Sequence, residues 1–129
     1  MNQNLYTEKA PEAVGPYSQA VVAGNLVFLS GQIPIDPATG AVVAGDISAQ
    51  AEQTCKNVGE ILKAAGADFE DVVKTTCFLK DMNDFAAFNA VYAKYFTGKP
   101  ARACVAVREL PKGALVEVEA VAVLNETHG

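Results

Sequence analysis

Residues 100–124 read PARACVAVRELPKGALVEVEAVAVL, and this stretch decides the fold class. It holds two β-rich runs, residues 101–107 and 115–124, joined through Leu110-Pro111-Lys112-Gly113. Because side chains alternate across a strand, the second run has two faces. One face carries Val116, Val118, Ala120 and Ala122, and the other carries Leu115, Glu117, Glu119, Val121 and Val123. We predict that helices cover the first face and that another subunit buries the aliphatic part of the second.

Further β-rich runs lie upstream of this stretch. Residues 17–23 and 26–30 are separated by Gly24-Asn25, which predicts a hairpin. Residues 72–79 are rich in valine and threonine and predict another strand. The sequence after residue 30 breaks the second strand, and one short extra strand is expected near Val42.

Two helices are predicted between the strands. A 3.6-residue apolar period predicts a helix over residues 46–65, with Asp46 as its N-cap. A second helix, begun by Asp81 or Asn83, is predicted to run to about Phe96. The order β-β-α-β-α-β-β predicts a single α+β domain over the 129 residues, with both helices on one face of a sheet.

Residue counts exclude several classes of protein. The chain is 50% hydrophobic, which predicts a globular domain, and its net charge of −5 does not favour a nucleic-acid partner. The one histidine, His128, stands next to the last residue, so we expect no histidine-based nucleophile pair or metal site. Cys55, Cys77 and Cys104 form no C-x-x-C motif, and we expect reduced thiols in the cytoplasm. We expect no secretory leader or membrane span, since the longest apolar runs have about five residues.

Arg102 lies in a basic region of an acidic chain. Residues 98–112 contain four basic side chains against the single acidic Glu109. The neighbours of Arg102 are small, which leaves room for a ligand beside its guanidinium, and arginine binds carboxylates bidentately. The alternatives are an internal salt bridge with a glutamate, or a packed stem with a solvated head.

Glu117 and Glu119 lie on one face of a strand whose other positions are aliphatic. A carboxylate among apolar neighbours has a raised pKa and can serve as a general acid or base. The alternative is that both are solvated or that one of them pairs with Arg102, and the residues alone favour this alternative.

Three more polar positions are candidates for a binding site. Asn89 lies on the apolar side of its helix, where a buried amide must bind either a ligand or the backbone. Tyr17 follows Gly15-Pro16 and is either a pocket residue or a half-buried aromatic. Ser30 precedes Gly31 at the strand break, where backbone amides are available to an anion, although a plain turn serine is the commoner explanation.

Several blocks of sequence are more specific together than any one residue. They are Gly15-Pro16-Tyr17-Ser18-Gln19-Ala20, Ser30-Gly31-Gln32-Ile33-Pro34, Asn89-Ala90-Val91-Tyr92, Pro100-Ala101-Arg102-Ala103-Cys104, and Leu110-Pro111-Lys112-Gly113 with Val116-Glu117-Val118-Glu119-Ala120. In this order and spacing, over about residues 6–123, the chain closely resembles the RidA (YjgF) family of reactive-intermediate deaminases.

The resemblance implies a chorismate-mutase-like fold with a mixed sheet. It also implies a homotrimer whose sheets form a central β-barrel, with three sites in clefts between subunits. The implied reaction is hydrolysis of enamines and imines, such as 2-aminoacrylate, 2-iminopropanoate and 2-iminobutanoate, which pyridoxal-phosphate enzymes release. The products would be a 2-oxo acid and ammonia, and the enzyme itself would need neither a cofactor nor a metal.

The resemblance also assigns roles to residues. Arg102 matches the arginine that grips the substrate carboxylate, and Glu117 matches the carboxylate near the attacking water. Glu119 is not the matching acid. The other matches are pocket positions, and at Cys104 the backbone lines the site: Tyr17, Ser30, Gly31, Asn89 and Cys104.

Some questions stay open at the level of sequence. The segment Thr97-Gly98-Lys99 is shorter than in several family members, so the mouth of the cleft and the preferred imine side chain are undetermined. Two other functions remain: a non-catalytic module that binds 2-oxo acids, and an RNA-acting translation inhibitor. The net charge of −5 counts against the RNA function. The binding module is not separated from the enzyme, because both would use Arg102.

Overall fold

The computed structural model describes residues 2–124, so the prediction about His128 lies outside the described residues. A six-stranded sheet has the order β1-β2-β3-β8-β6-β7, and a separate β-hairpin pairs β4 with β5. The elements in chain order are β1 (Gln3–Leu5), β2 (Ala20–Ala23), β3 (Leu26–Gln32), β4 (Ile35–Asp36), β5 (Ala41–Val42), α1 (Ile47–Ala64), β6 (Val72–Leu79), α2 (Phe85–Tyr95), β7 (Ala101–Ala106) and β8 (Val116–Val123).

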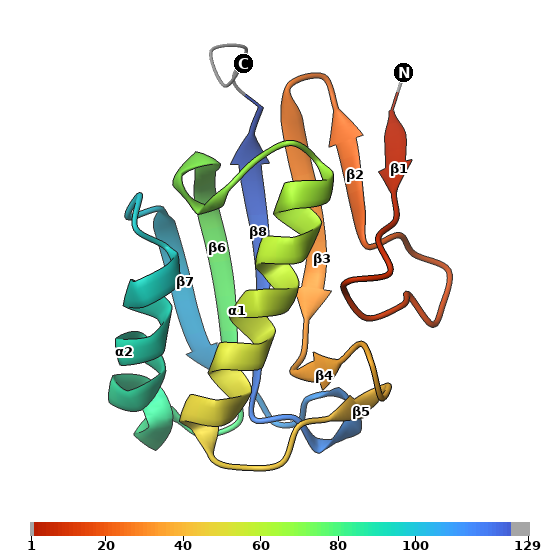
Figure 1. Cartoon of the computed structure of the whole chain (residues 1–129). Helices are drawn as coiled ribbons and strands as arrows, with labels where there is room; N and C mark the ends of the chain where they lie inside the picture. Colours follow the sequence, from red (N-terminus) through yellow and green to blue (C-terminus); the bar gives the residue numbers. More distant parts are fainter. Residues whose placement is uncertain (1, 125–129) are drawn as a thin grey trace.

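The sheet is mixed because β6 and β7 run parallel while every other neighbouring pair in it is antiparallel. The parallel connection passes through α2, and α1 and α2 lie on the same face of the sheet (Figure 1). The predicted α+β class and the two helices on one face are therefore confirmed. Within residues 2–124, neither helix is long and apolar enough to cross a membrane.

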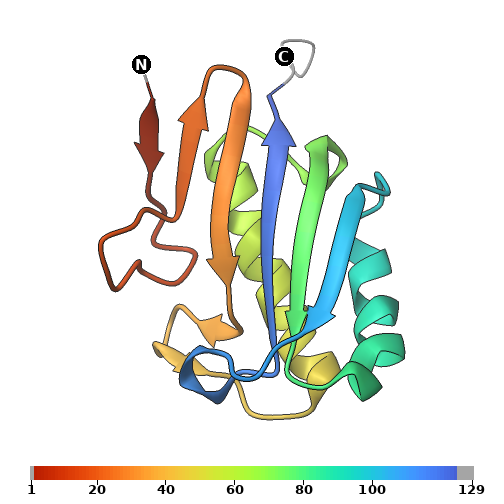
Figure 2. The same ribbon diagram turned by 180° about the vertical axis from the view of Figure 1, so that it is seen from behind.

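Strand β8 lies inside the sheet, between β3 and β6, and divides its side chains between two environments. Val116, Val118, Ala120 and Ala122 are at most 3% exposed and pack under the helices, as predicted. The other face of the sheet carries no helix (Figure 2). On that face Phe28 of β3, the register partner of Val121, is 45% exposed in a single chain.

The start of α1 agrees with the prediction, whereas the start of α2 does not. The Asp46 side chain caps α1 by accepting a hydrogen bond of 3.1 Å from the Ala49 amide. Gly66, just after α1, has φ of +83°, a conformation that glycine adopts without strain. The predicted start of α2 at Asp81 or Asn83 is wrong, because residues 82–84 form a 3-10 turn that Asp81 caps. The α-helix starts only at Phe85.

Several strand boundaries also differ from the prediction. Residues 17–19 do not belong to β2, because the Tyr17 amide donates to the Gly15 carbonyl in a tight turn. Strand β3 does not end at Ser30 but continues to Gln32 through a register shift against β8. The short strand expected near Val42 is confirmed as β5, whereas β1 was not predicted.

Asn57 connects α1 to the chain that follows β3. Its side chain is 1% exposed, and its Nδ2 donates to the carbonyls of Ile33 and Ile35 at 3.2 and 2.9 Å. Its Oδ1 accepts from Gln53 Nε2 at 2.9 Å. A buried amide with every polar atom bonded fixes this segment to the helix.

We expect Asn57→Asp to lower the free energy of unfolding by about 2–3 kcal/mol, because a carboxylate would face two carbonyls without a donor. Urea unfolding at fixed protein concentration, followed by circular dichroism, measures the change. Asn83→Asp is the matched control, since it adds the same charge at an exposed position and should cost less than about 0.5 kcal/mol. Equal losses in the two variants would contradict this role of Asn57.

Candidate active site

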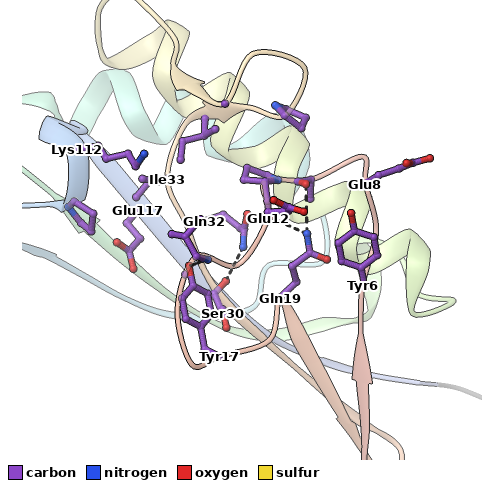
Figure 3. Close-up of a pocket in the computed structure, with 18 residues that line it drawn as sticks. Tyr6, Glu8, Glu12, Tyr17, Gln19, Ser30, Gln32, Ile33, Lys112 and Glu117 are labelled. Atoms are coloured by element: carbon purple, nitrogen blue, oxygen red, sulfur yellow. Dashed lines mark hydrogen bonds between the residues drawn. The ribbon is translucent and has the colours of Figure 1, made fainter.

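A cleft of about 650 Å³ opens beside the end of β3. Figure 3 shows Tyr6 and Glu12 of the N-terminal segment on one side of this cleft, with Lys112 and Glu117 on the other. Of the residues predicted for the site, it is lined by Tyr17, Ser30, Gly31 and Glu117. The structure therefore brings these four together, and it does so within one chain.

The Glu117 side chain lies directly against the backbone of Gly31. A Cβ atom at residue 31 would stand 2.0 Å from Glu117 Oε2, so any larger residue there would displace this carboxylate. Among residues 2–124 the half-buried carboxylate has no hydrogen-bond or ion-pair partner. Burial raises the pKa of Glu117, and the charge of Glu119 raises it further. This group is suited to exchange protons with something bound in the cleft.

Gln19 builds the N-terminal wall of the cleft. The side chain is 3% exposed; its Oε1 accepts from the Thr7 amide at 2.7 Å and its Nε2 donates to the Pro11 carbonyl at 2.8 Å. These bonds fasten residues 7–11 to the sheet. Our sequence reasoning did not single out Gln19, and its place in the Gly15–Ala20 block was the one available signal.

Ser30 and Tyr17 are held by the backbone around them. The Ser30 amide donates to the Gln19 carbonyl at 2.9 Å, so the expectation of an amide open to an anion is wrong at this residue. The Ser30 hydroxyl donates to the Ser18 carbonyl at 2.6 Å and keeps lone pairs that can accept. Tyr17 is 52% exposed, and its hydroxyl accepts a long bond of 3.4 Å from the Val14 amide.

The remaining predicted residues form a second cluster between β7 and α2. Arg102 Nη1 donates to Asn89 Oδ1 at 2.7 Å, and its guanidinium lies 4.8 Å from the ring centre of Tyr92. No carboxylate within residues 2–124 pairs with Arg102, so the salt-bridge alternative is wrong. Cys104 follows on the same strand face; burial raises the pKa of its thiol although Arg102 acts in the opposite direction. A neutral thiol does not serve as a nucleophile.

The two groups of residues lie on opposite faces of the sheet. Arg102 is the register partner of Thr75, whose buried side chain contacts α2. Glu117 is the register partner of Phe78 and points away from the helices, because Val116 and Val118 on either side of it point toward them. Arg102 and Glu117 therefore do not meet within one chain.

A family model described as Endoribonuclease L-PSP matches residues 7–124. The chain belongs to the RidA (YjgF) family. The 2-iminobutanoate/2-iminopropanoate deaminase of Mus musculus is 54% identical over 120 residues, which cover 92% of this chain and 89% of that one. The enzyme of the same name from Salmonella typhimurium is 54% identical over 127 residues, covering 95% and 98%.

Solved structures of RidA-family proteins have the same fold. The YjgF gene product of E. coli superimposes with a TM-score of 0.90 at 50% identity, covering 95% of this chain and 99% of that one. E. coli TdcF with bound serine gives a TM-score of 0.91 at 44% identity, also covering 95% and 99%. The family predicted from the five sequence blocks is therefore confirmed.

The raised pKa of Glu117 predicts how its replacement changes stability with pH. A carboxyl with a higher pKa in the folded state than in the unfolded state destabilises the fold when it ionises. This cost is absent below the unfolded pKa and grows as the pH rises through the folded one. We expect Glu117→Gln to be more stable than the wild type at pH 7 and equal to it near pH ~3.

Chemical unfolding at both pH values, at one protein concentration, measures this difference. Glu70→Gln removes the same charge from an exposed position whose charge does not act on Glu117, and it is the control. A Glu117→Gln stability difference that does not change with pH would contradict the raised pKa.

Proposed function

We propose that this protein hydrolyses imines of α-amino acids, and their enamine tautomers, to a 2-oxo acid and ammonia. The substrates would include 2-iminopropanoate, 2-aminoacrylate and 2-iminobutanoate. The observation that carries the proposal is the Glu117 carboxylate, which lies against Gly31 in the cleft with a raised pKa and without a partner among residues 2–124. Relatives named for this reaction at 54% identity support it.

The chemistry needs a positioned water and a group that moves protons. The imine carbon is already electrophilic, so water adds to it while Glu117 accepts a proton from that water. That proton is returned to the imine nitrogen, which gives a carbinolamine. Glu117 then moves the hydroxyl proton of the carbinolamine to its amino group, and ammonia departs as the C=O bond forms. An enamine must first take a proton on carbon to become the imine. No covalent intermediate with the protein is required.

Arg102 would hold the substrate by its carboxylate. Its Nη1 is bonded to Asn89, and no carboxylate of residues 2–124 occupies the rest of the guanidinium. An acid bound there places its α-carbon within the site and leaves the imine nitrogen free to react. The bound serine of E. coli TdcF, itself an α-amino acid, supports this class of ligand. Tyr17, Ser30, Gly31 and the Cys104 backbone would line the pocket.

The complete site would form between subunits of a homotrimer. Arg102 and Glu117 lie on opposite sheet faces, so a neighbouring copy must supply one of them. Phe28 and Val105 are each 45% exposed on the face without helices, and burying them against other copies would give the sheet its second cover. Three such sheets would enclose the central β-barrel that the family resemblance implies.

The RNA-acting alternative fits the cleft less well. Among residues 2–124 the cleft is lined by three carboxylates, Glu8, Glu12 and Glu117, and by one cation, Lys112. This balance of charge repels a phosphate backbone. The non-catalytic binding module uses the same arginine and differs only at Glu117. Replacing that residue by an amide separates the two functions, because binding would persist while turnover fell.

We place this activity in the cytoplasm. Cys55, Cys77 and Cys104 are all free thiols, and the first two are buried. Reduced, unpaired cysteines are typical of proteins from a reducing compartment, which supports this location.

A coupled assay tests the function. A threonine dehydratase generates 2-iminobutanoate in the presence of semicarbazide, which traps the imine, and added protein should speed 2-oxobutanoate formation. We expect Arg102→Ala to lower kcat/KM by about 30-fold, which corresponds to about 2 kcal/mol for a lost charge-assisted pair. Glu117→Gln should lower kcat while 2-oxobutanoate still binds.

Two matched variants serve as controls for this assay. Arg108→Ala removes the other arginine of the chain from an exposed position, and Glu70→Gln removes an exposed carboxylate that neither lines the cleft nor acts on Glu117. Both should keep wild-type rates. No acceleration by the folded wild-type protein would overturn the deaminase and favour the binding module.

Phe28→Asp tests the oligomer. A charge placed without a partner in an apolar interface is strongly unfavourable, so the variant should be monomeric at micromolar concentration. Light scattering coupled to size exclusion measures the mass. Ala38→Asp, in the exposed 36–40 turn, adds the same charge and should leave the trimer intact. A trimeric Phe28→Asp variant would contradict burial of this face.

A further inference from the structure

Tyr92 of α2 connects Arg102 to the interior of the protein. Its ring centre is 4.8 Å from the Arg102 Cζ, and its hydroxyl is 2.7 Å from Thr75 Oγ1. Tyr92 is 9% exposed and Thr75 is fully buried. Because Thr75 is the register partner of Arg102 on the neighbouring strand, the phenol is fastened beside the residue that its ring contacts.

Three residues of α2 surround the guanidinium. Phe85, Asn89 and Tyr92 stand at i, i+4 and i+7, a spacing that places them on one helix face. Helix α2 lies beside β7, the strand that carries Arg102 (Figure 1). The Phe85 ring centre lies 5.5 Å from the Arg102 Cζ, and Asn89 accepts the 2.7 Å bond from Nη1. Arg102 is thus held by two aromatic rings and one amide, and no carboxylate of residues 2–124 pairs with it.

Other aromatic rings of α2 and its C-terminal end pack against the Tyr92 ring and hold it in place. It stacks on Phe96 at 4.4 Å with an angle of 18° between the planes, and Phe88 lies 5.6 Å away. Burial raises the pKa of Tyr92, so the phenol stays neutral and keeps its hydrogen bond with Thr75 at physiological pH. Neither the ring nor its hydroxyl faces the cleft that Glu117 lines.

We infer that Tyr92, fastened by Thr75, is a positioning residue that holds the Arg102 guanidinium in the orientation needed to bind a substrate carboxylate. The inference rests on the proposed role of Arg102 in binding. A free arginine loses rotamer freedom when it grips a ligand, whereas a guanidinium already held against fixed rings loses less. The Tyr92–Thr75 bond therefore contributes to substrate affinity without touching the substrate.

Tyr92→Phe and Thr75→Val test this inference, since each breaks the Tyr92–Thr75 hydrogen bond and keeps the size of the substituted side chain. In the imine assay we expect KM to rise by about three- to ten-fold, with kcat within about two-fold of wild type. The two changes together should raise KM no more than either alone, because both break the same Tyr92–Thr75 bond. Thr75→Val also removes the 3.9 Å contact that Thr75 Oγ1 accepts from Cys77 Sγ. Thr75→Ser keeps the hydroxyl and should restore the wild-type KM.

Tyr95→Phe is the matched control on the same helix. The Tyr95 hydroxyl bonds Glu52 of α1 rather than a residue near Arg102, so its loss should leave KM unchanged. Circular dichroism and the oligomeric mass confirm that each variant is folded. A fall in kcat with constant KM, or an equal effect of Tyr95→Phe, would overturn the positioning role.

A second readout observes Arg102 without any turnover. The chain has two arginines, so in an Arg108→Lys background the one remaining Nε–Hε NMR signal belongs to Arg102. Tyr92→Phe and Thr75→Val should speed exchange of this proton with water and weaken 2-oxobutanoate binding by the same factor as KM, whereas Tyr95→Phe should not. Unchanged exchange in the first two variants would overturn the inference. If these two variants change the exchange rate while the wild-type protein shows no imine hydrolysis, the positioning role is supported and the proposed function is overturned.

Discussion

The alternation of side chains along β8 is the constraint on which the rest of the structure depends. This strand lies between β3 and β6, and its small and branched residues Val116, Val118, Ala120 and Ala122 are sealed under the two helices. A slip of one residue would push Glu117 and Glu119 into that apolar layer. Burying two unpaired carboxylates is prohibitive, so the same pattern that builds the core also fixes the register of the sheet.

This register determines what the charged residues can do. The Glu117 side chain points to the sheet face without helices, whereas Arg102, on the edge strand β7, faces α2. Because they lie on opposite faces, these side chains cannot form an internal ion pair, which would occupy the arginine and lower the pKa of the carboxyl. Their separation leaves each group available to a ligand, and it is the physical reason for proposing a site shared between subunits.

Much of this arrangement is predictable from the sequence, because periodicity and capping are local signals. The β6 strand and the α1 helix were predicted to within a residue or two, and five blocks of sequence indicated the family. The predicted element boundaries were wrong where tertiary contacts determine the local backbone structure. The turn at Tyr17 shortened β2, a 3-10 turn delayed α2, and a register shift carried β3 past Ser30. Gln19 and Tyr92 were missed as well, since nothing local distinguishes an ordinary polar or aromatic residue from one that holds a wall or an arginine.

The structure treats its two charged groups in opposite ways, and the proposed reaction explains why. In the proposed reaction Arg102 binds the substrate carboxylate at every step and does not change its charge. Packing it against the Tyr92 ring and bonding it to Asn89 therefore restricts its motion without hindering any step. A group that moves protons must change its charge in each cycle, and a fixed hydrogen-bond partner would favour one of its two states. Glu117 accordingly has no hydrogen-bond or ion-pair partner among residues 2–124. It lies half-buried against Gly31, where desolvation, and next the charge of Glu119, raise its pKa and favour the neutral form. Burial of this carboxylate lowers the stability of the fold. This loss is a consequence of its chemistry, because any hydrogen bond that removed it would also hinder the proton transfer.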